Sequence, residues 1–225
     1  MTTPDDFVSR ETKSEDELAA GVAAEHWPAA FPLLQRYHHW LVTAGVERGL
    51  VGPREVERMW DRHINNSAVL AEAVPQGATV IDVGSGAGLP GIPLAIVRPD
   101  LHVTLLEPLQ RRVEFLEEAT ADMGLAERIT VVRGRAEDAK GLTADIVTSR
   151  AVAALPKLLT WCWPLVKAGG AVIALKGAQA PAEIDAATNY MRKKGLTADI
   201  LTVGAGVVEP LTTLVRVQKN SASAN

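Results

Sequence analysis

The stretch of sequence that decides the fold reads Thr79-Val-Ile-Asp82-Val-Gly84-Ser-Gly86-Ala-Gly88-Leu89-Pro90-Gly91. Its apolar beginning has the length of a buried strand, and the glycines that follow favour a tight turn. Glycine lets a backbone approach a ligand closely, and the first turn of a helix offers that ligand free N–H groups. We therefore expect a strand, a ligand-binding loop and a helix, with Pro90 and Pro93 in the first helical turn.

The sequence after Ala78 alternates short apolar runs with helical patterns. The expected strands are 79–83, 103–106, 129–132, 146–148, 171–175, 200–203 and 211–217, and the expected helices are 92–97, 111–123, 155–166 and 181–194. Such alternation implies right-handed crossovers and a mainly parallel sheet. No segment of helix length separates the last two strands, so they should pair antiparallel. The pattern predicts an α/β fold with a Rossmann-like sheet whose last strand is antiparallel.

The part of the chain before this sheet shows helical periodicity from about residue 15 to residue 73. We expect an N-terminal helical segment over 1–75, an α/β domain over 76–219 and a polar, disordered tail over 220–225. A helix that begins after Pro53 would carry Arg54, Arg58 and Arg62 as one basic stripe, suited to phosphates or simply solvated beside neighbouring acids. For Arg54 and Arg58 these two interpretations are equally good.

The glycine loop fits two kinds of nucleotide ligand. Residues 86–91 match the dinucleotide pattern G-x-G-x-x-G, which keeps a NAD-dependent oxidoreductase open. Glu107 ends the next expected strand, where an acid accepts hydrogen bonds from ribose hydroxyls. Gly84 comes two residues before the dinucleotide pattern begins, and Asp82 places a carboxylate that suits a cationic methyl donor better than a pyrophosphate. A turn with no ligand is the remaining alternative.

The composition is that of an ordinary globular protein, with 225 residues of which 47% are hydrophobic and 22% charged. The formal net charge of −4 is unusual for a general nucleic-acid binder, so an RNA substrate would need a local basic patch. The single cysteine, Cys162, excludes an intrachain disulfide, and His38-His39 lacks companion acids or cysteines, so we expect no metal site. Residues 1–18 lack a secretory pattern and no apolar run approaches a membrane span, so we expect a cytoplasmic protein.

Several further motifs follow in order along the chain, and with them the sequence resembles the ribosomal RNA small-subunit methyltransferase G family (RsmG, also called glucose-inhibited division protein B). The matching segments are 62–63 with Ser67, 82–94, 112–116, 135–137, 149–151 and 175–177. They cover roughly residues 52–177. One departure lies at 49–54, which reads Gly-Leu-Val-Gly-Pro-Arg where many members have an Asn-Leu-Thr segment.

The resemblance implies a class I methyltransferase fold and S-adenosyl-L-methionine as the methyl donor. It implies N7-methylation of a guanine, usually called G527, in the 530 loop of 16S rRNA within a small-subunit ribosomal particle. By the resemblance, the residues that contact the donor are Gly84, Leu89, Ala136, Glu137 and Arg150, with Glu107 on its ribose; the loop pattern adds Asp82, Gly86 and Gly88. The residues expected near the RNA are Arg62, His63 and Lys176. We further expect a monomer.

The implied reaction needs no general base, because guanine N7 carries a lone pair and no proton. We expect Arg150 and Lys176, which end two neighbouring strands, to position the donor carboxylate, a phosphate or guanine O6. A buried cation is costly without an anion, so each should have one nearby. A non-catalytic ribosome-assembly factor that keeps the same fold is the alternative from another class, and a turnover assay separates the two.

Overall fold

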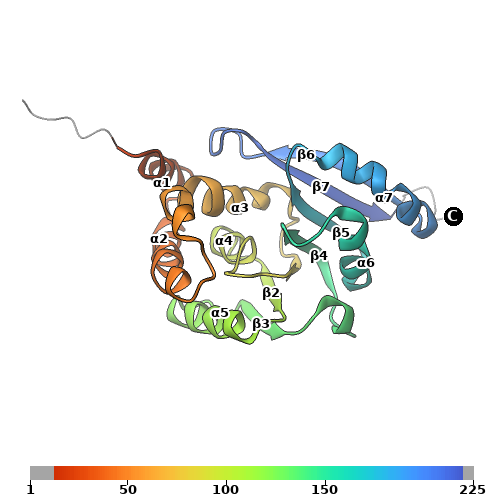
Figure 1. Ribbon diagram of the computed structural model, residues 1–225, viewed down its shortest axis with the longest axis horizontal. Coiled ribbons are helices and arrows are strands. Elements are labelled where there is room, and N and C mark those ends of the chain that lie inside the picture. Colours follow the sequence, from red (N-terminus) through yellow and green to blue (C-terminus); the bar gives the residue numbers. More distant parts are fainter. Residues whose placement is uncertain (1–12, 220–225) are drawn as a thin grey trace, which may run out of the picture.

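The computed structural model describes residues 13–219 and is built around one seven-stranded sheet (Figure 1). The strands are β1 (Thr79–Val83), β2 (His102–Glu107), β3 (Ile129–Arg133), β4 (Ala144–Arg150), β5 (Val166–Lys176), β6 (Leu196–Val203) and β7 (Thr212–Lys219). Their order across the sheet is β3-β2-β1-β4-β5-β7-β6. Strands β1 to β5 pair in parallel, and β7 runs antiparallel to both β5 and β6. The predicted α/β fold with an antiparallel last strand is confirmed.

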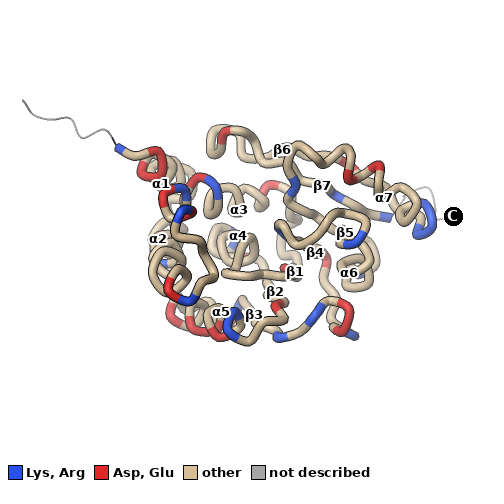
Figure 2. Tube along the Cα trace, in the orientation of Figure 1, with Lys and Arg blue, Asp and Glu red and all other residues tan. Residues whose placement is uncertain are grey.

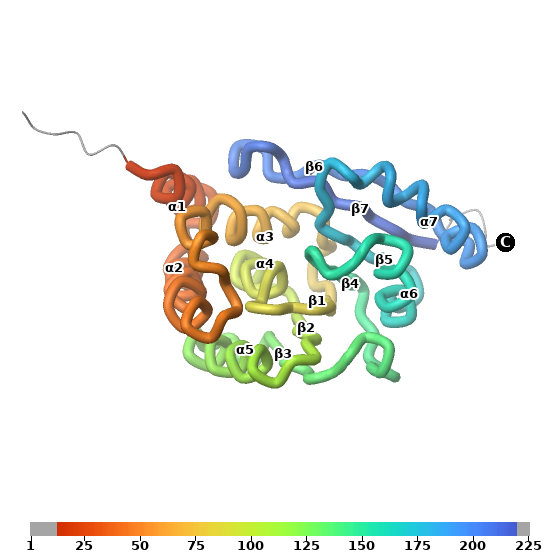
Figure 3. Tube along the Cα trace, viewed as in Figure 1, coloured from red at the N-terminus to blue at the C-terminus, as the bar shows by residue number. Residues whose placement is uncertain are grey.

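Helices cover both faces of this sheet. The α-helices are α1 (Glu15–His26), α2 (Phe31–Trp40), α3 (Asn66–Ala68), α4 (Gly91–Val97), α5 (Gln110–Asp122), α6 (Leu155–Cys162) and α7 (Ala180–Lys194). Shorter 3-10 or π-helical pieces are η1 (Leu41–Gly45), η2 (Pro53–Arg58), η3 (Met59–Asn65), η4 (Val69–Ala73), η5 (Ala136–Asp138) and η6 (Trp163–Leu165). The N-terminal helices pack with α4 and α5 against one face, and α6 and α7 pack against the other (Figure 3).

The N-terminal helices share a hydrophobic core with the sheet. Tyr37 of α2 and Ile64 of η3 are fully buried in the same cluster as Val80 of β1 and Leu105 of β2. The Tyr37 hydroxyl also donates a hydrogen bond of 2.8 Å to the carbonyl oxygen of Ala87, inside the glycine loop. The loop after β1 is therefore braced from the N-terminal side.

The helix expected after Pro53 is not continuous, which corrects the prediction of one regular helix there. The 3-10 helix η2 ends at Arg58, whose φ of −132° and ψ of 25° lie outside the helical region. A new helical stretch then begins, and Asp16 of α1 accepts hydrogen bonds from the backbone N–H groups of Trp60 at 2.7 Å and Asp61 at 3.4 Å. Asp16 and Trp60 are 44 positions apart, so the residues around Trp60 contain no cap that would indicate this second helix start.

Arg54, Arg58 and Arg62 do not form the single stripe that one regular helix would give them, since 3-10 and π turns do not repeat every 3.6 residues. Arg58 pairs with Asp61 at 3.0 Å, and Arg62 lies 3.7 Å from Glu55. Arg54 is exposed. A different basic cluster, Arg192-Lys-Lys194, ends α7 far along the chain, as Figure 2 shows.

Further boundaries differ from the sequence prediction, among them the start of β6 at Leu196 instead of residue 200. The helix expected over 155–166 ends at Cys162, and Pro164 lies in the 3-10 turn that follows, because proline lacks the N–H that an α-helix interior needs. Strand β5 begins earlier than expected, at Val166. The predicted disordered tail at 220–225 lies outside the described residues. Between residues 13 and 219, no helix is long and apolar enough to cross a membrane.

Candidate active site

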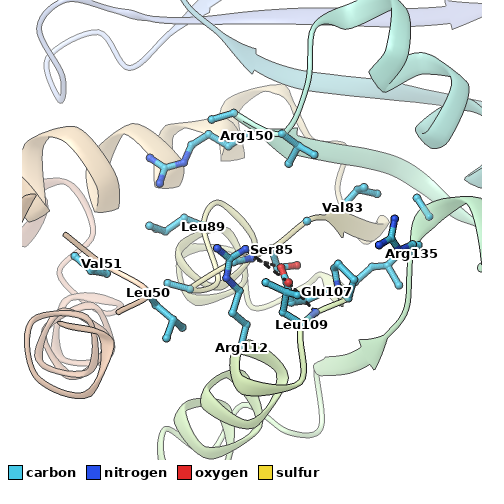
Figure 4. Close-up of a pocket in the computed structure, with 18 of the residues that line it drawn as sticks. Leu50, Val51, Val83, Ser85, Leu89, Glu107, Leu109, Arg112, Arg135 and Arg150 are labelled. Carbon is cyan, nitrogen blue, oxygen red and sulfur yellow. Dashed lines mark hydrogen bonds and ion pairs between the residues drawn. The ribbon is translucent and has the colours of Figure 1, made fainter. Parts of the chain in front are cut away.

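A cavity of about 700 Å³ opens at the carboxyl ends of β1, β2 and β4 (Figure 4). In parallel α/β sheets this edge is where ligands bind, and the volume suits a small-molecule ligand. Of the residues predicted to bind the donor, those that line it are Gly84, Gly86, Leu89, Glu107, Ala136, Glu137 and Arg150. Asp82 and Gly88 do not line it.

The glycine loop has the left-handed backbone that its sequence predicts. Gly84 has a φ of 71°, and its N–H donates to the carbonyl oxygen of Leu106 at 2.8 Å. A Cβ atom at Gly84 would lie 2.7 Å from a methyl carbon of Val152, so a side chain here would have to displace Val152 and would also strain the backbone. Gly86 has a φ of 60° and little beside it, which leaves its backbone facing the cavity.

Glu107, at the end of β2, is fully buried in the floor of this cavity. One carboxylate oxygen accepts the N–H of Gly86 at 2.9 Å, and the other accepts the N–H of Leu109 at 3.0 Å. Nη1 of Arg112, in α5, lies 3.7 Å from Oε1 of Glu107 and faces the same carboxylate, as Figure 4 shows. Each carboxylate oxygen can accept a second hydrogen bond, so Glu107 keeps acceptors for a ligand hydroxyl.

Asp82 is fully buried beneath the loop instead of lining the cavity. Its Oδ2 accepts the N–H of Gly91 at 3.0 Å, where α4 begins, and a Cβ at Gly91 would approach that oxygen to 2.9 Å. The other oxygen has no hydrogen-bond partner among residues 13–219. Burial raises the pKa of Asp82 to about 7. Asp82 thus holds the joint between loop and helix, and the geometry provides no direct contact with a ligand in the cavity.

Arg150, the last residue of β4, reaches over the cavity from the side opposite Glu107 (Figure 4). Its Nη1 lies 3.1 Å from Nδ1 of His63 and 3.5 Å from the carbonyl oxygen of Arg62. Burial lowers the pKa of the Arg150 guanidinium. Among the salt bridges formed within residues 13–219, none includes Arg150. The site therefore offers a largely buried cation with room for an anionic ligand group.

A second cavity, of about 1120 Å³, adjoins the first. The residues that line both cavities are His63, Arg150, Ala151 and Val152. All three residues predicted to lie near the RNA, Arg62, His63 and Lys176, line this second cavity. Ala151 has a φ of 56°, which is rare for a residue other than glycine and occurs often at functional sites. The two cavities thus meet at a strained turn directly after Arg150.

Lys176 has the nearby anion that its burial predicts, and this anion belongs to the protein itself. Its Nζ lies 2.7 Å from a carboxylate oxygen of Glu183 in α7 and donates to the carbonyl oxygen of Ala153 at 2.8 Å. The same Glu183 oxygen accepts the N–H of Leu155 at 2.7 Å, at the start of α6. Lys176 therefore ties the turn after β4 to α7.

Several lining residues were not predicted from the sequence. From the N-terminal segment these include Leu50, Val51, Glu55 and Met59, and after β2 and β3 they include Leu109, Arg112 and Arg135. Arg112 and Arg135 stood in the quoted motifs without an assigned role. Because α5 begins just after Glu107, a residue in its first turn such as Arg112 could have been predicted to lie near the Glu107 carboxylate. The N-terminal residues carry no such signal, because they reach the cavity only through packing of α2 and η3 on the sheet.

Comparison with known proteins agrees with this geometry. The family model for rRNA small subunit methyltransferase G matches residues 31–207. A ribosomal RNA small subunit methyltransferase G from Thermobifida fusca is 51% identical over 211 residues, covering 93% of this chain and 89% of the relative. One from Streptomyces coelicolor is 56% identical over 186 residues, covering 81% and 77%. A methyltransferase structure from Pyrococcus furiosus shares the fold, with a TM-score of 0.57, 15% identity and coverage of 70% and 83%. The chain belongs to the rRNA small subunit methyltransferase G family.

Proposed function

We propose that the protein transfers the methyl group of S-adenosyl-L-methionine to N7 of guanine G527, in the 530 loop of 16S rRNA within a small-subunit particle. The observation that carries this proposal is the pairing of two cavities at one wall. One holds the glycine loop and buried Glu107, and the other is bordered by Arg62 and Lys176. Membership of the family supports a ribosomal RNA substrate.

The residues of the first cavity fit the donor chemically. Glu107 keeps free acceptors for the ribose hydroxyls, and the backbone at Gly86 lies open beside it. Arg150 presents a guanidinium without a carboxylate partner among the described residues, which suits the donor carboxylate. Ala136 and Glu137, which the resemblance assigns to the donor, line the same cavity. When bound, S-adenosyl-L-methionine supplies an electrophilic methyl group on a cationic sulfonium.

The second cavity is where we place the target nucleotide. The Arg62 side chain is 56% exposed at its edge and suits an RNA phosphate, whereas Lys176 shapes the wall through its bonds to Glu183 and Ala153. The net charge of −4 predicts weak, salt-sensitive binding to naked RNA. Specificity then comes from the shape of the particle and an accessible loop base.

Catalysis proceeds by alignment, without a general base. Guanine N7 has no proton to remove, so no residue of the chain has to accept one before methyl transfer. Both ring nitrogens of His63 are already engaged, Nδ1 by Arg150 and Nε2 by Glu55. Holding two reactants in register can lower a barrier by ~7–11 kcal/mol. A loop base also costs less to unstack than a base in a duplex.

The experiment that tests this function is transfer of labelled methyl groups to small-subunit particles from cells that lack the gene. Wild-type protein should modify the particles in repeated turnovers, whereas an assembly factor that only binds would show none. Arg62→Ala should reduce the salt dependence of particle binding by a slope of about 1. Arg54→Ala is the matched control, because Arg54 lines neither cavity. Equal effects of the two substitutions would contradict the placement of the RNA.

A further inference from the structure

Glu55, His63 and Arg150 form a chain of hydrogen bonds from η2 to the end of β4. Oε2 of Glu55 lies 2.7 Å from Nε2 of His63, and Nδ1 of His63 lies 3.1 Å from Nη1 of Arg150. We propose that Glu55 and His63 are positioning residues that hold the Arg150 guanidinium at the wall between the two cavities, ready for the donor carboxylate. The identity of that carboxylate rests on the proposed function, whereas the hydrogen-bonded chain does not.

The chemistry of the three groups determines the tautomer of His63. An arginine guanidinium only donates hydrogen bonds, so Nδ1 facing Arg150 must be the unprotonated acceptor. The single proton of a neutral ring then lies on Nε2, which donates to the carboxylate of Glu55. The other tautomer, or the protonated ring, would point an N–H at the Arg150 donor and lose that bond. Glu55 therefore selects the one form of His63 that can hold Arg150.

The charges around His63 favour its neutral form. The side chain is only 16% exposed, and burial lowers the pKa of His63, with the positive charges of Arg150 and Arg62 lowering it further. Among the described residues Glu55 raises the pKa of His63, but burial and the two arginines together outweigh it, so the pKa is lowered overall. The acceptor at Nδ1 is therefore present at neutral pH and is lost as His63 becomes protonated under acidic conditions.

Arg150 depends on this acceptor because little else holds its guanidinium. Its other protein contact, to the carbonyl oxygen of Arg62, is long at 3.5 Å. Asp82 favours the charged form of Arg150, but no hydrogen bond joins the two side chains within residues 13–219. Arginine has many rotamers, so an unanchored guanidinium would lose entropy on every binding event. A guanidinium held in advance avoids that cost for the ligand.

The first test observes the tautomer directly by nitrogen-15 NMR of histidine-labelled full-length protein without ligand, with the His63 signals assigned from His63→Asn. The wild-type ring should show its proton on Nε2. Glu55→Ala should raise the fraction of rings that carry the proton on Nδ1, whereas Glu55→Gln, whose amide oxygen can still accept from Nε2–H, should keep the wild-type fraction. Glu57→Ala, an exposed acid of the same η2 helix, is the matched control. An unchanged tautomer in Glu55→Ala would overturn the proposal.

The second test measures S-adenosyl-L-methionine affinity by calorimetry. Glu55→Ala should weaken binding about fivefold to tenfold, the value of one hydrogen bond, and wild-type affinity should fall as the pH is lowered from 7.5 to 5.5. His63→Asn offers an amide oxygen near the position of Nδ1 and cannot titrate. In that background the pH effect and the effect of Glu55→Ala should both vanish. If Glu55→Ala weakens binding equally in both backgrounds, Glu55 acts only on local structure and the proposal is wrong.

The two tests also separate this inference from the proposed function. If the protein bound no S-adenosyl-L-methionine at all, the proposed function would fail while the NMR result would still decide how Glu55 acts on His63. If S-adenosyl-L-methionine bound normally and the His63 tautomer were the same with and without the Glu55 carboxylate, the proposed function would be supported and the positioning role contradicted.

Discussion

The carboxylate of Glu107 lies 2.9 Å from the backbone nitrogen of Gly86, so the acid that ends β2 holds the glycine loop that follows β1. The same carboxylate accepts the N–H of Leu109, at the entry to α5. One buried side chain therefore fixes two loops at the floor of the cavity. Because the donors in both hydrogen bonds are backbone N–H groups, exchanging a side chain in either loop leaves the donor group in place.

Glu107→Ala should weaken the binding of S-adenosyl-L-methionine by ~1.5–3 kcal/mol, because it removes the proposed acceptor for the ribose and loosens the glycine loop. Titration calorimetry at neutral pH measures the change. Glu117→Ala, an exposed acid on α5, is the control and should bind like the wild type. Micromolar binding of NADH together with no binding of S-adenosyl-L-methionine would instead support an oxidoreductase.

Asp82→Asn should become more stable relative to the wild type as the pH rises. The pKa of Asp82 is about 7 in the folded protein and near 3.8 when unfolded, so between these values the folded state holds the extra proton. Its contribution to stability is complete below pH 3.8 and is lost as the pH rises through 7. The difference should reach on the order of 4 kcal/mol, since each pKa unit corresponds to ~1.36 kcal/mol.

Urea unfolding without donor at pH 5 and pH 8 checks this prediction. The free energy of unfolding of Asp82→Asn minus that of the wild type should be larger at pH 8. Asp138→Asn, an exposed acid after β3, should show no such change with pH. A difference independent of pH would mean that Asp82 is charged throughout this range.

The parts of the site that the sequence predicted are those built by neighbouring residues. The loop at 84–91 and the acid at Glu107 follow from glycine spacing and strand ends, which act over short distances. The hydrogen bond from Tyr37 to Ala87 joins residues 50 positions apart, and the one from Arg150 to His63 joins residues 87 positions apart. No periodicity records such contacts, because tertiary packing creates them.

The same reasoning explains the expectations that were wrong or incomplete. The spacing of the residues after Pro53 predicts one regular helix. In the structure a second helical stretch begins there, because Asp16 of α1 accepts a hydrogen bond from the backbone N–H of Trp60. The anion expected near Lys176 could not be identified from the sequence, because Glu183 belongs to a helix whose docking the sequence does not specify. Asp82 was expected in the cavity because its place in the motif does not reveal which way its side chain points.

Lys176→Met should lower the free energy of unfolding by ~1.5–3 kcal/mol, since it breaks a hydrogen-bonded ion pair whose lysine side chain is only 8% exposed. Chemical unfolding at neutral pH measures this, with Lys140→Met as an exposed control. The salt dependence of particle binding should stay unchanged. A reduced salt slope with unchanged stability would show that Lys176 binds phosphate and not Glu183.

The rate of a single turnover at saturating donor and particle should be flat from pH 6 to pH 9, because N7 requires no deprotonation. Saturating donor removes the effect of His63 on affinity, so only a catalytic role could appear in this profile. His63→Ala should keep the flat profile. A steep rise near the ordinary histidine pKa of ~6.5 that disappears in His63→Ala would identify a general base.

The most direct test of the central claim is chemical cleavage at N7-methylguanine in 16S rRNA, mapped in cells with and without the gene. The account predicts cleavage at G527 when the gene is present, its loss when the gene is deleted, and its return with the wild-type gene. Glu107→Ala should restore it poorly if the encoded protein accumulates normally. Cleavage at G527 that persists without the gene, or a lost modification at another nucleotide, would contradict the account.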